Sequence, residues 1–248
     1  MKRAIVVFLL FLALPVAARA ADLECTVSPK AIDIHALYNG TTLAIDGRVP
    51  QGDQVVVRFT GAPENIALKQ KGKAFGLLWM NMNTLHFENV PKVCLIESTV
   101  PEAQLGAAGA GLGLAGLSEK IAIEPQSADR KMLLPEFLLL KGQEGLYRQS
   151  AGTVALGEAS GGQQAFHATM NIPSRLSPGS YTVEVFAVKD GVIDATTSQV
   201  VEAKLTGAPA FLADLAFNYG AMYGVLASII AILGGLAIGL VFQSKGAH

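Results

Sequence analysis

The stretch LSPGSYTVEVFAVKDGVIDATTSQVVEAKL, residues 176–205, decides the fold of this chain. Apolar and polar residues alternate on both sides of Asp190-Gly191, which predicts strands over 180–189 and 192–205 joined by a tight hairpin turn. The segment that opens the stretch resembles the corner leading into a late strand of a β-sandwich, where a tyrosine hydroxyl bonds back to the main chain. We therefore expect a structural role for Tyr181.

The same period of two runs through residues 25–99, with turn residues between the apolar groups. About seven short strands spaced roughly ten residues apart are typical of an antiparallel sandwich of immunoglobulin-like class. The alternating positions are Ile32, Ile34 and Ala36; Leu43 and Ile45; Val55, Val57 and Phe59; Leu77 and Trp79; and Leu85 and Phe87.

Trp79 is the only tryptophan of the chain. Its place in the middle of an apolar strand favours a position in the core of the first sandwich. The alternative is an exposed platform for a ligand.

The second half of the chain also predicts strands, over 120–124, 152–156 and 164–172, and a helix near 128–148 on either side of Pro135. The predicted fold class is mainly β. We expect two immunoglobulin-like β-sandwich domains, at 21–102 and 119–206, with a short helical insertion in the second.

Residues 103–118 consist mostly of glycine, alanine and leucine. Gly111, Gly113 and Gly116 match the dinucleotide-binding fingerprint by letter, but no strand precedes them as a βαβ unit requires. We expect a linker between the two domains, either flexible or forming a surface of small residues that packs on a partner.

Both ends of the chain carry apolar runs. Residues 1–20 have a basic start, a short apolar run and an Ala-x-Ala site, which predicts a secretory signal peptide cleaved before Ala21. Residues 221–242 hold no charge, and 22 residues suffice to cross a hydrocarbon core of about 30 Å. We expect a C-terminal transmembrane helix there, after a juxtamembrane segment at 207–220 and before a cytoplasmic tail at 243–248.

Within the expected span, small residues recur at helical spacing and form one stripe. Such a stripe allows close approach of a second helix, from an integral membrane partner or from another copy of this chain. The alternative is that the glycines reflect only the general composition of membrane helices. The positions are Gly224, Ser228, Ala231, Gly235 and Gly239.

The expected mature chain holds two cysteines, Cys25 and Cys94. In an oxidising compartment the default expectation is a disulfide between them. The alternative is two buried free thiols at separate core positions.

The sequence contains no set of residues typical of catalysis or metal binding. His35 and His86 lie on strands that would have to meet to form a metal site, and we expect ordinary surface histidines instead. Lys69, Lys71 and Lys73 alternate along one segment, which favours a solvated face over an anion or lipid headgroup site. Between its two apolar ends the chain holds 15 basic and 20 acidic residues, a net charge of −5, which argues against a nucleic-acid binder. We therefore expect a protein that is not an enzyme and holds no cofactor.

Several segments resemble a family of transmembrane proteins described from alphaproteobacteria, which has no assigned function. The resemblance covers about residues 23–242, and its landmarks are 72–81, Phe87 with Val90-Pro91, Gly145-Leu146-Tyr147, Pro178-Gly179 with Tyr181, and Tyr223-Gly224. It implies a signal peptide, a periplasmic β-rich region, one C-terminal span and no catalytic residues. It also implies a transporter partner, a permease similar to sulfite exporters.

We therefore expect a single-pass accessory protein of the bacterial cytoplasmic (inner) membrane, with its N-terminal domains in the periplasm and its helix docked on an integral membrane partner. The alternative is an envelope ligand-binding or sensing module that acts through its sandwich loops and uses the helix only as an anchor.

Overall fold

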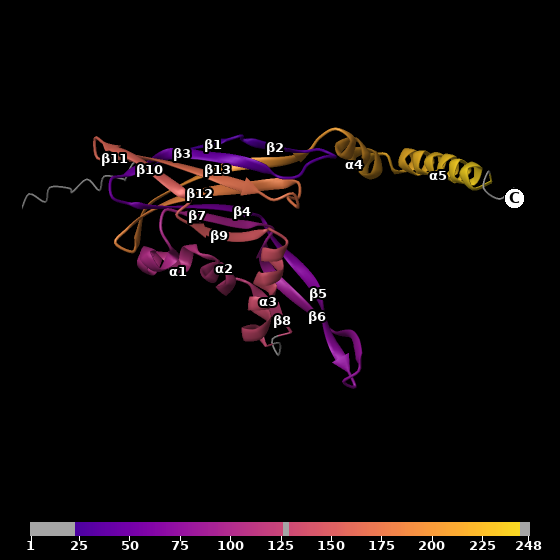
Figure 1. Ribbon diagram of the computed structural model, residues 1–248, viewed down its shortest axis with the longest axis horizontal. Coiled ribbons are helices and arrows are strands. Elements are labelled where there is room, and N and C mark those ends of the chain that lie inside the picture. Colours follow the sequence, from indigo (N-terminus) through magenta and orange to yellow (C-terminus); the bar gives the residue numbers. More distant parts are fainter. Residues whose placement is uncertain (1–22, 126–128, 244–248) are drawn as a thin grey trace, which may run out of the picture.

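The computed structural model describes residues 23–125 and 129–243. The expected signal peptide lies outside these residues, as does all of the expected tail except Gln243. The described chain is mainly β, as predicted, with one apolar helix at its C-terminal end (Figure 1). The strands are β1 (Glu24–Ser28), β2 (Ala31–Ile34), β3 (Thr41–Pro50), β4 (Gln54–Gly61), β5 (Pro63–Ala74), β6 (Leu78–Pro91), β7 (Cys94–Ser98), β8 (Ala122–Glu124), β9 (Tyr147–Ala151), β10 (Val154–Ser160), β11 (Gln163–Ile172), β12 (Gly179–Lys189) and β13 (Val192–Leu205). The helices are η1 (Glu102–Leu105), α1 (Gly106–Leu112), α2 (Leu114–Glu119), α3 (Arg130–Gln143), α4 (Ala208–Asn218) and α5 (Gly220–Gln243).

Two sheets pack face to face around a first core. One has the strand order β1-β3-β11-β10 and the other β2-β13-β12-β4-β7-β9. Alternate residues of the long strands point between the sheets, so that Leu43, Ile45, Phe59 and Met170 are fully buried there. The alternation seen in the sequence therefore marks the inner faces of β3 and β4 correctly, whereas two of the alternating positions, Leu77 and Trp79, are exposed.

The two expected domains are not separate, which corrects the sequence-based prediction for 21–102 and 119–206. Strand β3 pairs with β11, and β12 pairs with β4, so both halves contribute to both sheets. The physical reason is that period two shows which side of a strand is buried but carries no information about the strand that pairs with it. One sandwich forms, and the segment 62–153 between β4 and β10 contributes β7 and β9 to its larger sheet.

The rest of this segment, apart from β7 and β9, covers the outer face of the larger sheet with a second core. Val56, Cys94, Ile96 and Phe186 point outward from the sheet and are buried in this core, where Phe137 of α3 also lies. Strand β4 is thus buried on both faces, which explains its unbroken Val55-Val56-Val57 run. Figure 1 shows α1, α2 and α3 along this face of the sandwich.

The glycine- and alanine-rich segment is not a linker. It forms η1, α1 and α2, and the side chains of Leu105 and Leu112 are buried in the second core. A Cβ on Gly106 would lie 2.8 Å from the Cα of Gly191, and the amide of Ala108 donates a hydrogen bond of 2.9 Å to the Gly191 carbonyl. The glycines therefore allow a close approach of this segment to the β12–β13 turn.

Other local predictions are confirmed. Lys189 pairs with Val192 across the Asp190-Gly191 turn, and the hydroxyl of Tyr181 donates a hydrogen bond of 2.6 Å to the carbonyl of Ser177. The Tyr181 ring also stacks on Phe59 at 5.1 Å between centroids. The expected helix near 128–148 is α3, which is shorter than predicted because β9 begins at Tyr147.

Candidate functional site

The C-terminal helix α5 is long and apolar enough to cross a membrane. Its candidate span, Gly220–Phe242, has 23 residues with a mean hydropathy of 2.7 in its most apolar window, none of which is buried in the protein. The predicted span 221–242 lies inside it. In Figure 1, α4 and α5 extend away from the end of the sandwich at which β13 ends.

The predicted stripe of small residues lies on one face of α5. Its five members follow one another at steps of three or four residues and are all exposed: Gly224, Ser228, Ala231, Gly235 and Gly239. The hydroxyl of Ser228 donates a hydrogen bond of 2.8 Å to the Gly224 carbonyl, so it is satisfied within the helix. Apart from chain neighbours and the backbone of α5 itself, no described atom lies within 4 Å of a Cβ added at Gly224, Gly235 or Gly239. This face is therefore open to close approach by another helix.

The helix before the span, α4, also exposes apolar side chains. Phe211 and Phe217 are exposed, while Leu215 packs against the protein. The amide of Tyr219 donates to the carbonyl of Leu215 at the end of α4, and the amide of Tyr223 donates to the carbonyl of Tyr219 at the start of α5. Tyr219 itself has a φ of −132° and a ψ of 52°, so the helix is interrupted between α4 and α5. The exposed rings of Tyr219 and Tyr223 thus lie where the apolar span begins, as expected for interfacial aromatic residues.

A second exposed apolar surface lies at the end of the β5–β6 hairpin. Its loop residue Phe75 is 98% exposed, has a φ of +49° and precedes Gly76, whose φ is +73°. We call the far end of this hairpin, residues 69–82, the hairpin tip. Its large exposed apolar side chains are Phe75, Leu77, Leu78, Trp79, Met80 and Met82.

Trp79 is therefore not a core residue, and its predicted position in the first sandwich is wrong. The side chain is 69% exposed, and the ammonium group of Lys73 lies 5.4 Å from the centre of its ring. The physical reason is that β5 and β6 form a two-stranded extension that no other sheet covers near its end. Apolar residues occupy consecutive positions from Leu77 to Met80 and so break the period of two. This is the sequence feature that could have indicated an exposed position for Trp79.

The two cysteines are free thiols, which corrects the predicted disulfide. Cys25 lies on β1 and packs against the first core, whereas Cys94 lies on β7 and is buried in the second core on the opposite side of the larger sheet. Burial raises the pKa of the Cys25 thiol to about 11 and that of Cys94 to about 12. Both groups are protonated at neutral pH and are poor nucleophiles.

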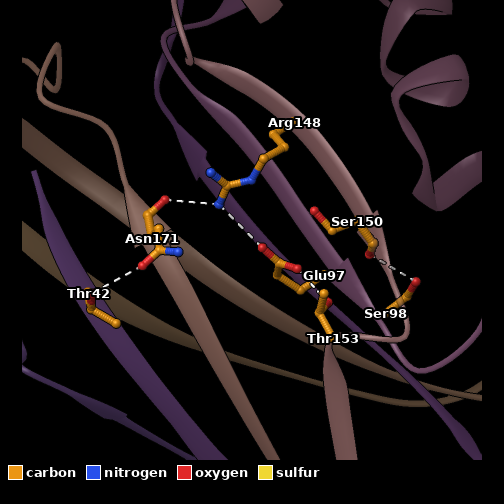
Figure 2. A network of polar contacts seen from close by, with 7 residues as sticks. All are labelled: Thr42, Glu97, Ser98, Arg148, Ser150, Thr153 and Asn171. Carbon is orange, nitrogen blue, oxygen red and sulfur yellow. Dashed lines mark hydrogen bonds and ion pairs between the residues drawn. The ribbon is translucent and has the colours of Figure 1, made fainter.

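A polar network joins the two sheets at the side where β7 and β9 meet β11 (Figure 2). Glu97 is 3% exposed, accepts from Arg148 at 3.3 Å through one carboxylate oxygen and from the Thr153 hydroxyl through the other. Arg148 also donates to the carbonyl of Asn171 at 3.0 Å. Both carboxylate oxygens of Glu97 already accept hydrogen bonds from protein groups, which favours a structural link between the two sheets over a ligand-binding site. We call this network the clasp between sheets.

Other polar groups lie apart from one another. His35 lies in the turn after β2 and His86 on β6, and within the described residues no three His, Cys, Asp or Glu side chains are close enough to hold a metal ion. A cavity of about 530 Å³ lies where the β12–β13 turn faces the start of α1, lined among others by Gln104, Gly106, Lys189 and Asp190. Nearby Asp53 is fully buried, and its carboxylate has no hydrogen-bond partner among the described residues.

Two apolar surfaces, α5 and the hairpin tip, are thus the most distinctive exposed features of the chain. Residues 22–244 match the model of the family described as "Putative transmembrane protein (Alph_Pro_TM)". The chain belongs to this family. The match includes every described helix and strand, and it agrees with the resemblance found in the sequence. No curated protein matches the chain. Alph_Pro_TM is a transmembrane family of unknown function, and in this member α5 is the candidate membrane helix.

Sequence reasoning found the stripe on α5 but missed the hairpin tip as a surface. The structure does not bring the stripe and the cysteines together: they lie on α5, β1 and β7. The signal for the tip was present in the lysines and the consecutive apolar residues of 69–82, but alternation elsewhere made a core strand the simpler interpretation.

Proposed function

We propose that this chain is an accessory protein of the bacterial inner membrane, anchored by α5 with its β-rich region in the periplasm. In this proposal α5 docks on an integral membrane partner, such as a transporter. The observation that carries the proposal is the open face of small residues on a helix that is apolar all round. In lipid, apolar side chains gain no free energy by leaving the hydrocarbon, so helices associate mainly through close packing of their backbones. Faces of small residues allow that close packing.

The proposed location rests on the two ends of the chain. A cleaved signal peptide at 1–20 would bring the mature chain across the membrane, and the charge-free span would stop its transfer. No catalytic activity is part of this proposal.

We also propose that the sandwich is of immunoglobulin-like class. With β1, β3, β4, β10, β11, β12 and β13 as strands A to G, one sheet has the order A-B-E-D and the other contains G-F-C. The hydrogen bond from Tyr181 to Ser177 at the start of β12 is a further feature of that class. A single domain of this kind suits a binding role, since its edges and loops can meet a partner.

Co-purification tests the docking proposal. The full-length chain is purified in mild detergent from its own host, together with the variants Gly235→Leu and Ala237→Leu. Gly235 lies within the stripe, whereas Ala237 lies about 200° further around the helix, on the opposite face. Both changes add a leucine side chain to a small residue, so the pair separates a contact face from a general effect of bulk.

We expect a stoichiometric membrane protein to co-purify with the wild-type chain and with Ala237→Leu, and to be lost with Gly235→Leu. Mass spectrometry identifies the partner, and circular dichroism checks that the β-rich region stays folded. Retention of the partner by Gly235→Leu contradicts docking through the stripe. A homodimer that Gly235→Leu dissociates would instead assign the stripe to self-association.

A further inference from the structure

We propose that the hairpin tip is a lipid-binding element that inserts into the interface of an anionic bilayer, as a second membrane contact besides α5. The proposal rests on the hairpin and on α5 as an anchor, and it does not depend on a partner for α5. It assigns the exposed apolar residues of 69–82 to the headgroup region of the membrane.

Apolar residues lie on both faces of the end of the hairpin and at its turn. Across the ladder Lys73 pairs with Trp79 and Gly72 with Met80, and paired residues point to the same face of the ribbon. Trp79 therefore lies on one face, Met80 on the other, and Phe75 and Leu77 at the turn between them. A protein partner would cover one face of such a ribbon, whereas lipid surrounds it on every side.

The lysines lie along one face of the hairpin, with Lys73 beside Trp79 and Lys71 and Lys69 further from the turn. Lys69, Lys71 and Lys73 alternate along β5 and share the face of Trp79, with Lys73 stacked on its ring. Residues 65–87 hold these three lysines and no aspartate or glutamate, although the whole chain has a net charge of −1. Ammonium groups at that position meet the phosphates of anionic lipids when the apolar end enters the interface.

The hairpin presents this end on a fixed base. Leu85 and Phe87 of β6 are buried in the second core, Phe87 stacks on Phe137, and β6 pairs with β8 near its base. Further out, Lys69 donates to the Thr84 hydroxyl at 3.1 Å and so links the two strands. The tip is therefore preformed, and binding does not require the hairpin to order.

The tip and α5 both reach beyond the same end of the sandwich. In Figure 1 the β5–β6 hairpin leaves the lower face of the sandwich obliquely, and its tip extends past the end from which α4 and α5 continue. The unpaired edges of β5 and β6 must stay hydrated, which limits insertion to the boundary of headgroups and acyl chains. A chain held by α5 in the same membrane thus keeps the tip within reach of lipid.

Trp79 makes the proposal directly measurable, because no other tryptophan contributes to the fluorescence. The full-length chain is reconstituted in vesicles of phosphatidylglycerol and phosphatidylcholine, and in vesicles of phosphatidylcholine alone. Each set is also prepared with lipids brominated on their acyl chains, which quench a tryptophan only at short range. The chain can insert with its β-rich region outside or inside the vesicle. The measurement does not depend on this orientation, since the tip faces the bilayer that holds α5 in both.

In anionic vesicles we expect Trp79 emission to shift to the blue and to be quenched by brominated lipid, with a clearly smaller effect in phosphatidylcholine alone or at high salt. The triple variant Lys69→Gln, Lys71→Gln, Lys73→Gln is expected to lose most of the quenching in anionic vesicles. The matched control Lys30→Gln, Lys131→Gln, Lys204→Gln changes three exposed lysines elsewhere and is expected to retain it.

Unshifted and unquenched emission in anionic vesicles overturns the proposal, and so does quenching of equal size in both kinds of vesicle. A blue shift that appears in detergent without lipid and grows with protein concentration also overturns it and assigns the tip to a second copy of the chain. The wild-type measurement requires no variant, so a variant that fails to fold does not weaken the test.

Discussion

At the scale of single residues, Gly106 has two reasons to be glycine. Its φ is +60°, and a Cβ there would lie 2.8 Å from the Cα of Gly191. Gly111, in the same helix, has an open position in which a Cβ would meet no atom within 4 Å. The two glycines therefore predict opposite effects of the same substitution.

We expect Gly106→Ala to lower the free energy of unfolding by about 1–2 kcal/mol, because it adds left-handed strain to a backbone clash. Gly111→Ala is expected to raise it by about 0.5–1 kcal/mol, since alanine favours the helix. Chemical denaturation followed by circular dichroism measures both. Equal effects of the two variants would contradict a docked position for α1 at the β12–β13 turn.

Asp53 is a residue whose charge works against folding. Desolvation first, and the charge of nearby Asp194 second, raise the pKa of its carboxyl above the usual value of 3.8. The folded state therefore binds this proton more tightly than the unfolded state does. Stability from this group is present below pH 3.8 and is lost as the pH rises through the higher folded-state pKa.

Asp53→Asn removes that charge and is expected to stabilise the chain at pH 7, by about 1–2 kcal/mol. The advantage should shrink as the pH falls and disappear once the wild-type carboxyl is protonated. Thermal unfolding at a series of pH values checks this, with Asp33→Asn, an exposed aspartate, as control. A variant less stable than the wild type at pH 7 would show that the carboxylate has a stabilising partner.

At the scale of elements, the clasp between sheets makes a clear prediction. Arg148→Ala leaves the buried Glu97 without its positive partner, whereas Arg175→Ala removes an exposed ion pair with Glu144. We expect a loss of about 1–3 kcal/mol for Arg148→Ala. Arg175→Ala should change stability by less than about 1 kcal/mol.

Urea unfolding of both arginine variants provides the comparison. If Arg148→Ala costs no more than Arg175→Ala, the network in Figure 2 does not hold the sheets together. If Glu97→Gln with Arg148→Met restores stability, the cost of the single change lies in the buried charge that it leaves.

Elements were predictable from the sequence where one local pattern decides the structure. The β12–β13 hairpin followed from alternation around Asp190-Gly191, and α5 from its charge-free run. The prediction of a linker at the glycine-rich segment was wrong because its few large residues, Leu105 and Leu112, are buried only through packing on a distant sheet face. The prediction of a core position for Trp79 was wrong for the converse reason, since no sheet face lies near enough to bury its side chain.

At the scale of the whole molecule, tertiary pairing was beyond reach of the sequence. The joining of β3 with β11 and of β4 with β12 spans more than a hundred residues, and nothing local distinguishes it from pairing within each half. The same pairing places Cys25 and Cys94 in different cores, so the predicted disulfide failed with the predicted domains. The stripe on α5 was found because a helical face needs only spacing.

The junction between sandwich and span has a mechanical consequence. Only Thr206 and Gly207 separate β13 from α4, and the amide of Thr206 still donates to the Ile34 carbonyl at 3.0 Å. Strand β13 and α4 are therefore closely joined, whereas the non-helical backbone of Tyr219, with a φ of −132° and a ψ of 52°, separates α4 from α5. A change in the tilt of α5 within the bilayer can thus be absorbed at Tyr219, and the sandwich need not turn with the span.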